Sequence, residues 1–246
     1  MIIKWIDVLP IKGKAAAFSN AQVAWEATAG SEGFKGQLGG WHDSKKENSD
    51  KDSQSQHAMI LAFWDDFNAI NAFMAGKHDE IVDNNNQAQT YQSCHVHYLQ
   101  LELQFEPQFE SKPELALNTI PSTVKYLGGL KGLIPSDIGF IRIADCTLFS
   151  DETGITEQTF FNDQTRVWNP AMQACEGMLG GVVARFIKQH NRFLVISFWQ
   201  NEACHRQYMA GAFQTAKSRV SLELYIEQLA GYQIVIESKW YIEAGA

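Results

Sequence analysis

The chain has 246 residues, of which 45% are hydrophobic and 20% charged, and its formal net charge at pH 7 is −8. That length fits one large domain or two domains of about 100 residues each. The acidic balance, without any dense run of Lys or Arg, argues against a nucleic-acid partner. The longest apolar runs are short, such as Met59–Trp64, so no segment approaches the roughly 20 apolar residues that cross a bilayer.

The termini and the cysteines indicate a reducing compartment. The first ten residues, "MIIKWIDVLP", read as a strand and lack the long apolar stretch of a secretion signal. The four cysteines, at positions 94, 146, 175 and 204, show no C-x-x-C spacing, and we predict that they are free thiols in apolar packing. The sequence therefore predicts a cytoplasmic protein with no membrane partner.

Six elements are predicted in the first half, in the order strand, helix, strand, strand, helix, strand. They span residues 2–9, 13–30, 33–42, 58–64, 65–86 and 93–106. Apolar residues at helical spacing and a terminal Gly30 define the first helix, whereas Asp caps begin the second and Gly76 interrupts it. Apolar residues at alternate positions from His97 to Phe105 indicate a long strand with one buried face. This order is that of a ferredoxin-like unit.

Two segments are predicted to be connections. The 14 residues from Asp43 to Gln56 include no apolar residue, which indicates a solvated loop, or less simply a cover for a pocket mouth. Residues 107–136 contain four prolines and are predicted to link two halves of the chain.

The second half repeats the pattern of the first. "GQLGG" at 36–40 matches "GMLGG" at 177–181, "MILAFW" ending at Trp64 matches "LVISFW" ending at Trp199, and "FMAG" at 73–76 matches "YMAG" at 208–211. Two further matches keep the same order along the chain: one around Trp25 and Trp168, the other in the last strand of each half. Five matches in one order favour a duplication. Glycines inside a strand usually mark a bulge or a bend, so we interpret the two glycine motifs as structural rather than phosphate-binding.

These observations predict an α+β fold built from two ferredoxin-like βαββαβ repeats, residues 1–106 and 137–246, with 107–136 as the linker. One such repeat leaves a sheet face bare, and two repeats can cover each other's bare faces. We therefore expect an intramolecular dimeric α/β-barrel, a pseudo-dimer within one chain, and leave further oligomerisation open.

Several motifs of the first half resemble those of a known family. "KWIDV" (4–8), "GQLGGWH" (36–42), "FW" (63–64), "HDEIVDNNNQ" (78–87) and "TYQS" (90–93) are similar to those of the YdbC-like family of uncharacterised bacterial proteins, within the dimeric α/β-barrel superfamily. The resemblance implies a ligand pocket between the sheet and helices of one unit. The superfamily includes antibiotic-biosynthesis and haem-degrading monooxygenases, isomerases and stress-responsive proteins, so fold alone does not assign a function.

Cofactor use follows from the same resemblance. Haem-degrading members carry an Asn, a Trp and a His together, whereas here Phe73 stands at the position of the Trp and Asp83 near that of the His. The resemblance therefore disfavours haem degradation, and we predict no cofactor.

Differences between the two halves point to a candidate site in the first. The first half has aromatic or imidazole side chains where the second is mostly apolar. The pairs are Trp5 and Ile143, Trp41 and Val182, His42 and Val183, His78 and Phe213, His95 and Ala230, and His97 and Tyr232. We therefore predict a cavity within residues 1–106, with His97 and His78 as candidate catalytic residues. The candidate ligand-binding residues are Trp5, Trp41, His42, His95 and Phe73.

The histidines leave alternatives open. His95 and His97 are two residues apart on a strand, so they share a face, which we predict to be the buried one. They are then satisfied core histidines, an acid or base in a pocket, or a metal pair completed by His42 or His78. Because the sequence places no carboxylate nearby, we predict no metal site. His78 either faces the cavity or lies on an exposed helix end.

Two functions remain. The first is a non-catalytic barrel that binds a small apolar or aromatic ligand in the first repeat. The second is a monooxygenase-like oxidoreductase that oxidises a small aromatic or polycyclic substrate without a cofactor, with a His as the base. No Ser-His-Asp, P-loop or Rossmann motif favours another class of enzyme. We favour the binding protein because no catalytic motif is complete.

Overall fold

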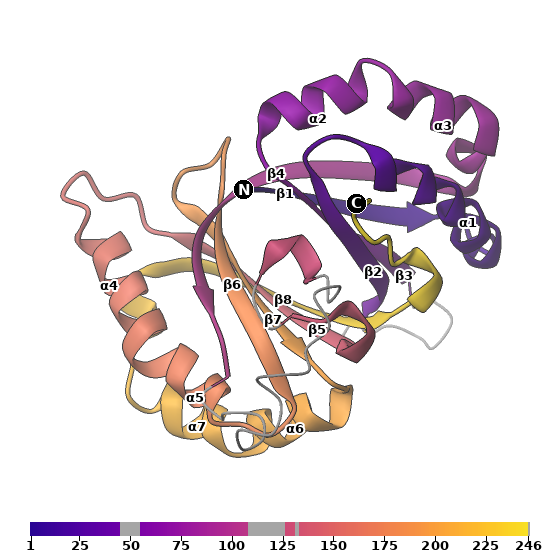
Figure 1. Ribbon diagram of the computed structural model, residues 1–246. Coiled ribbons are helices and arrows are strands. Elements are labelled where there is room, and N and C mark those ends of the chain that lie inside the picture. The colour runs from indigo at the N-terminus through magenta and orange to yellow at the C-terminus, as the bar shows by residue number, and fades with distance from the viewer. Residues whose placement is uncertain (45–54, 108–125, 131–132, 246) are drawn as a thin grey trace, which may run out of the picture. The chain divides into compact units, whose positions relative to one another are not determined.

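A computed structural model of the chain describes residues 1–44, 55–107, 126–130 and 133–245 (Figure 1). Most of the loop predicted for 43–56 and most of the linker predicted for 107–136 lie outside these residues. The chain divides into two compact units. Unit 1 contains residues 1–100, 127–129 and 233–246, and unit 2 contains residues 101–126 and 130–232.

Unit 1 follows the predicted order of elements. They are β1 (Ile2–Pro10), α1 (Ala15–Gln22), the 3₁₀ helix η1 (Val23–Gly30), β2 (Phe34–Ser44), β3 (Ser55–Trp64), α2 (Phe67–Met74), α3 (Lys77–Asn85), η3 (Gln87–Thr90), β4 (Tyr91–Phe105), η4 (Leu127–Gly129) and η8 (Ser238–Trp240). β1 pairs with both β3 and β4, and β2 pairs with β3, all antiparallel. The end of β8 (Ile226–Ile236) adds to β2 through the pairs Gly40–Ile236 and Trp41–Val235.

The helices of unit 1 begin and end where the sequence indicates. The Asp66 carboxylate caps α2 by accepting a hydrogen bond from the Ala69 N–H at 2.9 Å. Gly76 separates α2 from α3. Asn86 caps the C-terminus of α3 and has a positive φ of 51°, which Asn tolerates better than most residues. Two short helices therefore replace the single predicted one.

Unit 2 has the same order of main elements. They are η5 (Pro135–Asp137), β5 (Phe140–Leu148), α4 (Ile155–Asp163), the π-helical turn η6 (Gln164–Trp168), α5 (Asn169–Gln173), β6 (Met178–Phe186), β7 (Arg192–Trp199), α6 (Glu202–Ala210), α7 (Ala212–Lys217), η7 (Leu222–Leu224) and β8 (Ile226–Ile236). β7 pairs antiparallel with β5 and β6. Among the described residues, the hydrogen-bonded strand order is β4-β1-β3-β2 in unit 1 and β8-β5-β7-β6 in unit 2. The α+β class is confirmed.

Glycines interrupt the strand register once in each unit. The pairing of β2 with β3 shifts just before Gly36, and that of β6 with β7 shifts just before Gly180. Their φ values, +120° and +147°, lie where residues with a side chain are strained. The bulges that the glycine motifs predict are confirmed.

The two motifs nevertheless do not correspond residue by residue. Trp64 pairs with Phe34, two residues before the bulge glycine, and Trp199 pairs with Met178, again two residues before it. The sequence alignment of the motifs is therefore wrong by three residues, because both strands are rich in glycine. The corrected partners of Trp41 and His42 are Arg185 and Phe186, rather than Val182 and Val183.

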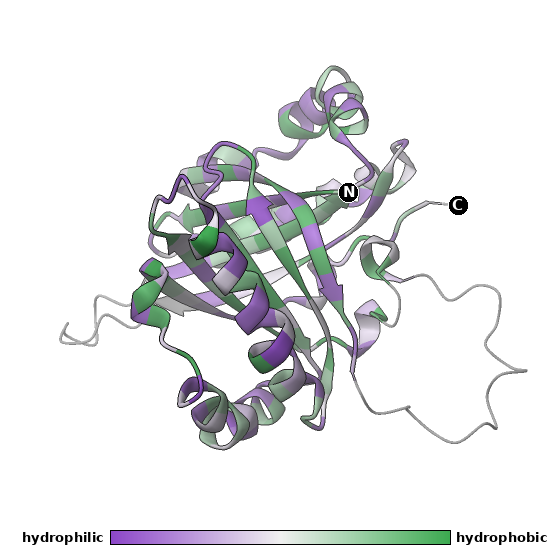
Figure 2. Cartoon of the chain, turned by 90° about the vertical axis from the view of Figure 1, so that its left-hand side faces the viewer, coloured by the Kyte–Doolittle hydropathy of each residue, from purple (hydrophilic) through white to green (hydrophobic). Residues whose placement is uncertain are grey.

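Apolar side chains fill the space between sheet and helices in each unit, and Figure 2 shows apolar and polar residues alternating along the strands. In unit 1 one cluster packs Phe18 of α1 against Trp240, Val8 and Ile60. A cluster in unit 2 includes the fully buried Phe193. Within the described part of the chain, no helix is long and apolar enough to cross a membrane.

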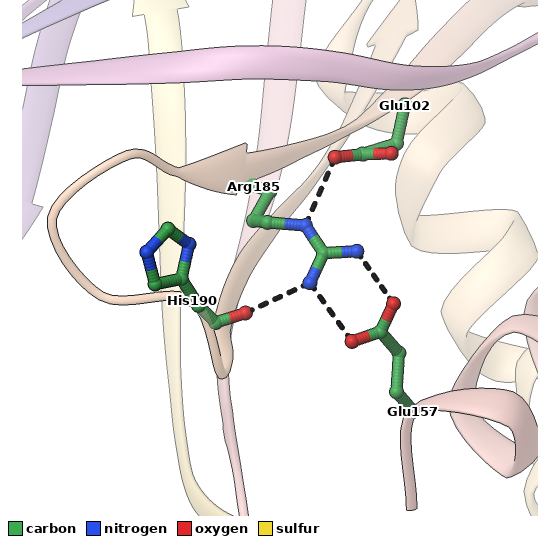
Figure 3. Close-up of polar contacts among 4 residues, drawn as sticks. All are labelled: Glu102, Glu157, Arg185 and His190. Carbon is green, nitrogen blue, oxygen red and sulfur yellow. Dashed lines mark hydrogen bonds and ion pairs between the residues drawn. The ribbon is translucent and has the colours of Figure 1, made fainter. Parts of the chain in front are cut away.

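An arginine in β6 ties α4 to the sheet of unit 2 (Figure 3). Arg185 donates to both Glu157 carboxylate oxygens, at 2.5 and 2.8 Å, and to Glu102 at 2.9 Å. It also donates to the His190 carbonyl at 3.0 Å. These hydrogen bonds hold the pKa of Glu157 below its ordinary value, as expected for a fork-like pair.

Candidate ligand-binding site

A cavity of about 240 Å³ lies in unit 1, between the sheet and the helices. Side chains of β1, β3 and β4 form its floor, and residues of α1, η1, α2 and α3 cover it. Most of the lining is apolar or aromatic. The aromatic members are Phe18, Trp25, Phe34, Trp64, Phe73 and Tyr91.

A lysine lies in this apolar floor. Lys4 of β1 lines the cavity and is only 7% exposed. Among the described residues its ammonium contacts Met74 Sδ at 3.9 Å, and a thioether is a weak acceptor. Burial lowers the pKa of Lys4 because it disfavours the charged form. A buried cation without a strong acceptor is costly, so this position favours a ligand that carries an acceptor oxygen.

Two further donors in the lining are buried and lack partners within the described residues. They are the indole N–H of Trp64, at the end of β3, and the amide nitrogen of Asn85, at the end of α3. The carbonyl oxygen of Asn85 is occupied, because it accepts the N–H of Gln87 at 2.8 Å. An unmade hydrogen bond at a buried polar atom costs about 1–3 kcal/mol. With Lys4, the cavity therefore presents three donors that need acceptors.

Three other polar side chains of the lining form hydrogen bonds with one another. The Trp25 indole donates to the Gln87 side-chain oxygen at 2.7 Å, and the Gln87 amide donates to the Gln22 side-chain oxygen at 2.8 Å. Gln22 and Gln87 are both buried. This chain of hydrogen bonds fixes Trp25 against the cavity and joins α1, η1 and η3.

Two of the residues predicted for the site line the cavity. The ring of His78 lies 5.5 Å from Trp25 and 5.8 Å from Phe73, centroid to centroid. Phe73 also lies 5.1 Å from Trp64. The Nδ1 atom of His78 is 2.9 Å from the Asp79 carboxylate, which orients the imidazole at the edge of the aromatic lining.

Trp41 and His42 are not part of the lining. Trp41 packs beside the cavity on Phe18 and Trp240, with centroids 6.2 and 4.9 Å away, and its indole lies 3.4 Å from Glu237. The next residue, His42, projects from the other face of β2, where its Nδ1 lies 3.0 Å from the Gln233 carbonyl.

The prediction that His95 and His97 share the face of the cavity is wrong. Cys94 and Val96 of β4 line the cavity, so the alternating histidines project from the opposite side of the sheet. His95 is exposed and His97 half-buried. Trp5, also predicted for the site, stacks on His97 there at 5.3 Å.

One histidine on that opposite face has a charged partner that the sequence does not indicate. His57 of β3 lies 2.9 Å from the Asp7 carboxylate of β1. This hydrogen bond raises the pKa of His57. A charged partner two residues along a neighbouring strand cannot be identified before the register of the strands is known.

Other candidate centres are less suited to binding. A larger recess of about 530 Å³ in unit 2 is formed mostly by exposed residues near Asp151. The Asp151 carboxylate is already occupied, since it accepts hydrogen bonds from Thr153 and Thr156. Within the described residues, no three His, Cys, Asp or Glu side chains are grouped as metal ligands. All four cysteines are free, as the sequence predicts.

Solved structures with the same fold come from several bacteria. A protein of Fusobacterium nucleatum named "Putative monooxygenase" has a TM-score of 0.65 and 10% identity, and the match covers all of this chain and 95% of that one. A protein of the same description from Lactobacillus acidophilus has a TM-score of 0.60 and 12% identity, covering 100% and 97%. An anthrone oxidase-like protein has a TM-score of 0.53 and 9% identity, covering 96% and 91%. Identities this low show a common fold alone.

Sequence comparison identifies the family. Residues 2–99 match the model described as Domain of unknown function (DUF4937). The uncharacterized protein YdbC of Bacillus subtilis is 32% identical over 96 residues, which are 39% of this chain and 75% of YdbC. The matched residues form β1 to β4 with the helices above them, and so include the cavity of unit 1. The chain therefore belongs to the YdbC-like family.

Proposed function

We propose that unit 1 binds a small aromatic compound that carries a carboxylate, phenolate or carbonyl oxygen. The observation that carries this proposal is the set of three donors in an aromatic cavity: Lys4, Trp64 and Asn85. Their free N–H groups match a ligand oxygen, and the surrounding rings match an aromatic body.

The size of the cavity supports a ligand of one or two rings. An apolar void of about 150 Å³ holds a benzene molecule, so the 240 Å³ of this cavity accommodate a substituted ring or a fused pair. The ammonium of Lys4 gives the main electrostatic preference for an anionic ligand. The rings of Trp25 and His78 border the space that the ligand body would occupy.

The proposal includes a duplicated origin of the two units. Both run β-α-β-β-α-β, both have a bulge glycine in the second strand, and both cap the helix after the third strand with an Asp or Asn side chain. We therefore retain two ferredoxin-like repeats, 1–106 and 137–246, with 107–136 as the linker. The cavity of unit 1 then belongs to the first repeat.

A second candidate function is oxidation of the bound compound. Burial of Lys4 lowers its pKa, so a larger fraction of its amine is neutral and able to accept a proton. Removal of a phenolic proton by this amine, or by His78, gives an electron-rich anion that can react with added dioxygen. The structural relatives described as monooxygenases suggest this chemistry only by analogy of fold.

The binding proposal is tested by titrating the full-length protein with one- and two-ring aromatic carboxylates, for example benzoate and 1-naphthoate, while following tryptophan fluorescence. We expect saturable quenching, because Trp25 and Trp64 line the cavity. Lys4→Met keeps the apolar stem but removes the charge, and should weaken naphthoate binding at least tenfold. Arg142→Met in unit 2 is the matched control, and should leave naphthoate affinity unchanged.

Two results would contradict the proposal: no saturable binding across the panel, or equal naphthoate affinity in the wild type and Lys4→Met. Oxidation is tested separately by measuring dioxygen consumption with hydroxylated two-ring compounds. Consumption that Lys4→Met abolishes favours the enzyme. Saturable binding without dioxygen consumption supports the binding function and not the oxidation.

A further inference from the structure

Unit 2 contains a cavity of its own, about 150 Å³ in volume, between its sheet and helices. Its apolar walls include Phe160, Trp168, Met172, Val195 and Phe213. The residues of this half that align with the candidate site of the first half are mostly apolar, which favours an assignment to packing. Three polar side chains in the lining do not fit that assignment.

The first is an arginine on the floor. Arg142 of β5 donates through Nη1 to the carbonyl oxygens of Ile143 and Tyr232. Within the described residues, its Nη2 and Nε make no hydrogen bond, and no carboxylate pairs with it. A Cβ atom at position 231 would overlap the guanidinium, so Gly231 makes room for Arg142. Arg142 is thus an unpaired cation held at the edge of an apolar cavity.

The other two are buried groups with unused hydrogen-bonding atoms. His205 of α6 is 1% exposed, and its Nε2 has no partner among the described residues. Gln164 of η6 is 6% exposed, and its side-chain oxygen likewise lacks a partner there. Both residues line the cavity. Burial and the charge of Arg142 lower the pKa of His205 to about 4, so the imidazole is neutral at pH 7.

We propose that the cavity of unit 2 binds a single-ring aromatic carboxylate whose ring carries a hydroxyl or amino group. The carboxylate would accept hydrogen bonds from the free nitrogens of Arg142, and the ring substituent would donate to the Gln164 oxygen. His205 Nε2 completes the polar lining as a donor or acceptor, according to its tautomer.

Size and chemistry both support this class of ligand. A void of this volume holds one benzene ring and excludes a fused pair. A half-buried guanidinium without a carboxylate partner among the described residues favours an anion. The glutamine oxygen can only accept hydrogen bonds, so a ligand without a donor leaves it unsatisfied. The three unpartnered groups of the unit 1 cavity are all donors, whereas unit 2 requires a ligand with both an anionic and a donor group.

The test titrates the full-length protein by calorimetry with benzoate, the three hydroxybenzoates, 2-aminobenzoate and the neutral phenol. We expect a hydroxy- or aminobenzoate to bind at least fivefold more tightly than benzoate, and phenol to bind weakest. By the proposal above, unit 1 also takes one-ring carboxylates, so the wild type should show two classes of site. Each titration is therefore repeated in Lys4→Met, which should weaken the unit 1 site only and leave the site that prefers the hydroxy- or aminobenzoate.

Arg142→Met should weaken the preferred ligand at least tenfold, with circular dichroism confirming the fold. Gln164→Leu is the second variant, and serves also if Arg142→Met does not fold. Gln164→Leu should bind the preferred hydroxy- or aminobenzoate no more tightly than benzoate. Its affinity for benzoate should be unchanged, because benzoate has no ring substituent to donate to Gln164. The proposal is overturned if Arg142→Met binds the ligand as the wild type does, if Gln164→Leu keeps the preference, or if Lys4→Met rather than a unit 2 variant abolishes binding.

Discussion

The two cavities occupy the same place within two similar units, yet the polar groups that line them have different hydrogen-bond partners. The strand registers place Lys4 opposite Ala62 in unit 1 and Arg142 opposite Ser197 in unit 2. Both units therefore have a cation at the same point of the first strand.

The tryptophan at the end of the third strand shows the contrast most clearly. In unit 2 the Trp199 indole donates to Ser197 Oγ at 2.9 Å. In unit 1 the equivalent of that serine is Ala62, and the indole of Trp64 has no partner among the described residues. The same scaffold thus satisfies a buried indole in one unit and leaves it available to a ligand in the other.

A second contrast lies on the opposite face of the sheets. Asp145 pairs with Arg192 in unit 2, with oxygen–nitrogen distances of 2.6 and 2.8 Å. The equivalent Asp7 of unit 1 pairs with His57. An arginine keeps its charge at every physiological pH, whereas a histidine loses it. The same position on the sheet therefore holds a permanent ion pair in unit 2 and a pH-dependent one in unit 1.

The largest expected effect on stability comes from breaking the permanent pair. Asp145 is 5% exposed, so Arg192→Met leaves a buried carboxylate without its partner and should lower the free energy of unfolding by about 3 kcal/mol. His57→Gln, which removes the equivalent partner in unit 1, should cost about 1 kcal/mol or less at pH 7.5. Urea unfolding of both variants measures the difference, and equal losses would contradict the contrast.

A smaller effect is expected from the two tryptophans. Trp199→Phe leaves Ser197 without its donor and should destabilise unit 2 by about 1 kcal/mol beyond the loss of ring contacts. Trp64→Phe removes an indole N–H that has no partner within the described residues, so it should cost less than Trp199→Phe. Thermal unfolding monitored by circular dichroism compares them, and a greater loss in Trp64→Phe would show that this indole is satisfied.

Transferring the serine of unit 2 to unit 1 sharpens the comparison further. Ala62→Ser should give Trp64 an acceptor, as Ser197 does for Trp199, and should weaken naphthoate binding about fivefold, the value of one neutral hydrogen bond. Ala62→Cys is the matched control, since a thiol of similar size accepts hydrogen bonds poorly. If the two variants weaken binding equally, added volume and not the indole N–H explains the effect.

The smallest effect is the pH dependence of the His57–Asp7 pair. The pKa of His57 is raised in the folded protein, so its stabilising contribution is present below about pH 6.5 and is lost as the pH rises through the folded pKa. Asp7→Asn should remove this dependence, which amounts to less than about 1 kcal/mol. NMR titration of the His57 ring measures it, and a pKa unchanged by Asp7→Asn would contradict the pairing.

Periodicity and capping residues predict the order of elements well, because both signals are local. The cap at Asp66, the break at Gly76 and the glycine bulges all follow from short stretches of sequence. The register of the glycine motifs cannot be obtained in this way, since several glycines fit the same pattern. Only the pairing with the neighbouring strand distinguishes them.

The site is predicted less well, because sequence alternation shows which residues share a face but not which face the helices cover. His97 is therefore placed on the wrong side of the sheet, whereas His78 and Phe73 lie on helices above the cavity. Lys4 had a detectable signal. It interrupts an apolar strand, and the second half has Arg142 at the same position.

The central claim is that the three donors of the unit 1 cavity bind an acceptor oxygen of an aromatic ligand. The most direct test is a crystal structure of the full-length protein with 1-naphthoate. We predict its carboxylate within hydrogen-bonding distance, about 2.7–3.2 Å, of Lys4 Nζ and of the Trp64 or Asn85 nitrogen. Naphthoate bound elsewhere, or a cavity that holds only water bridging those three donors, would contradict the claim.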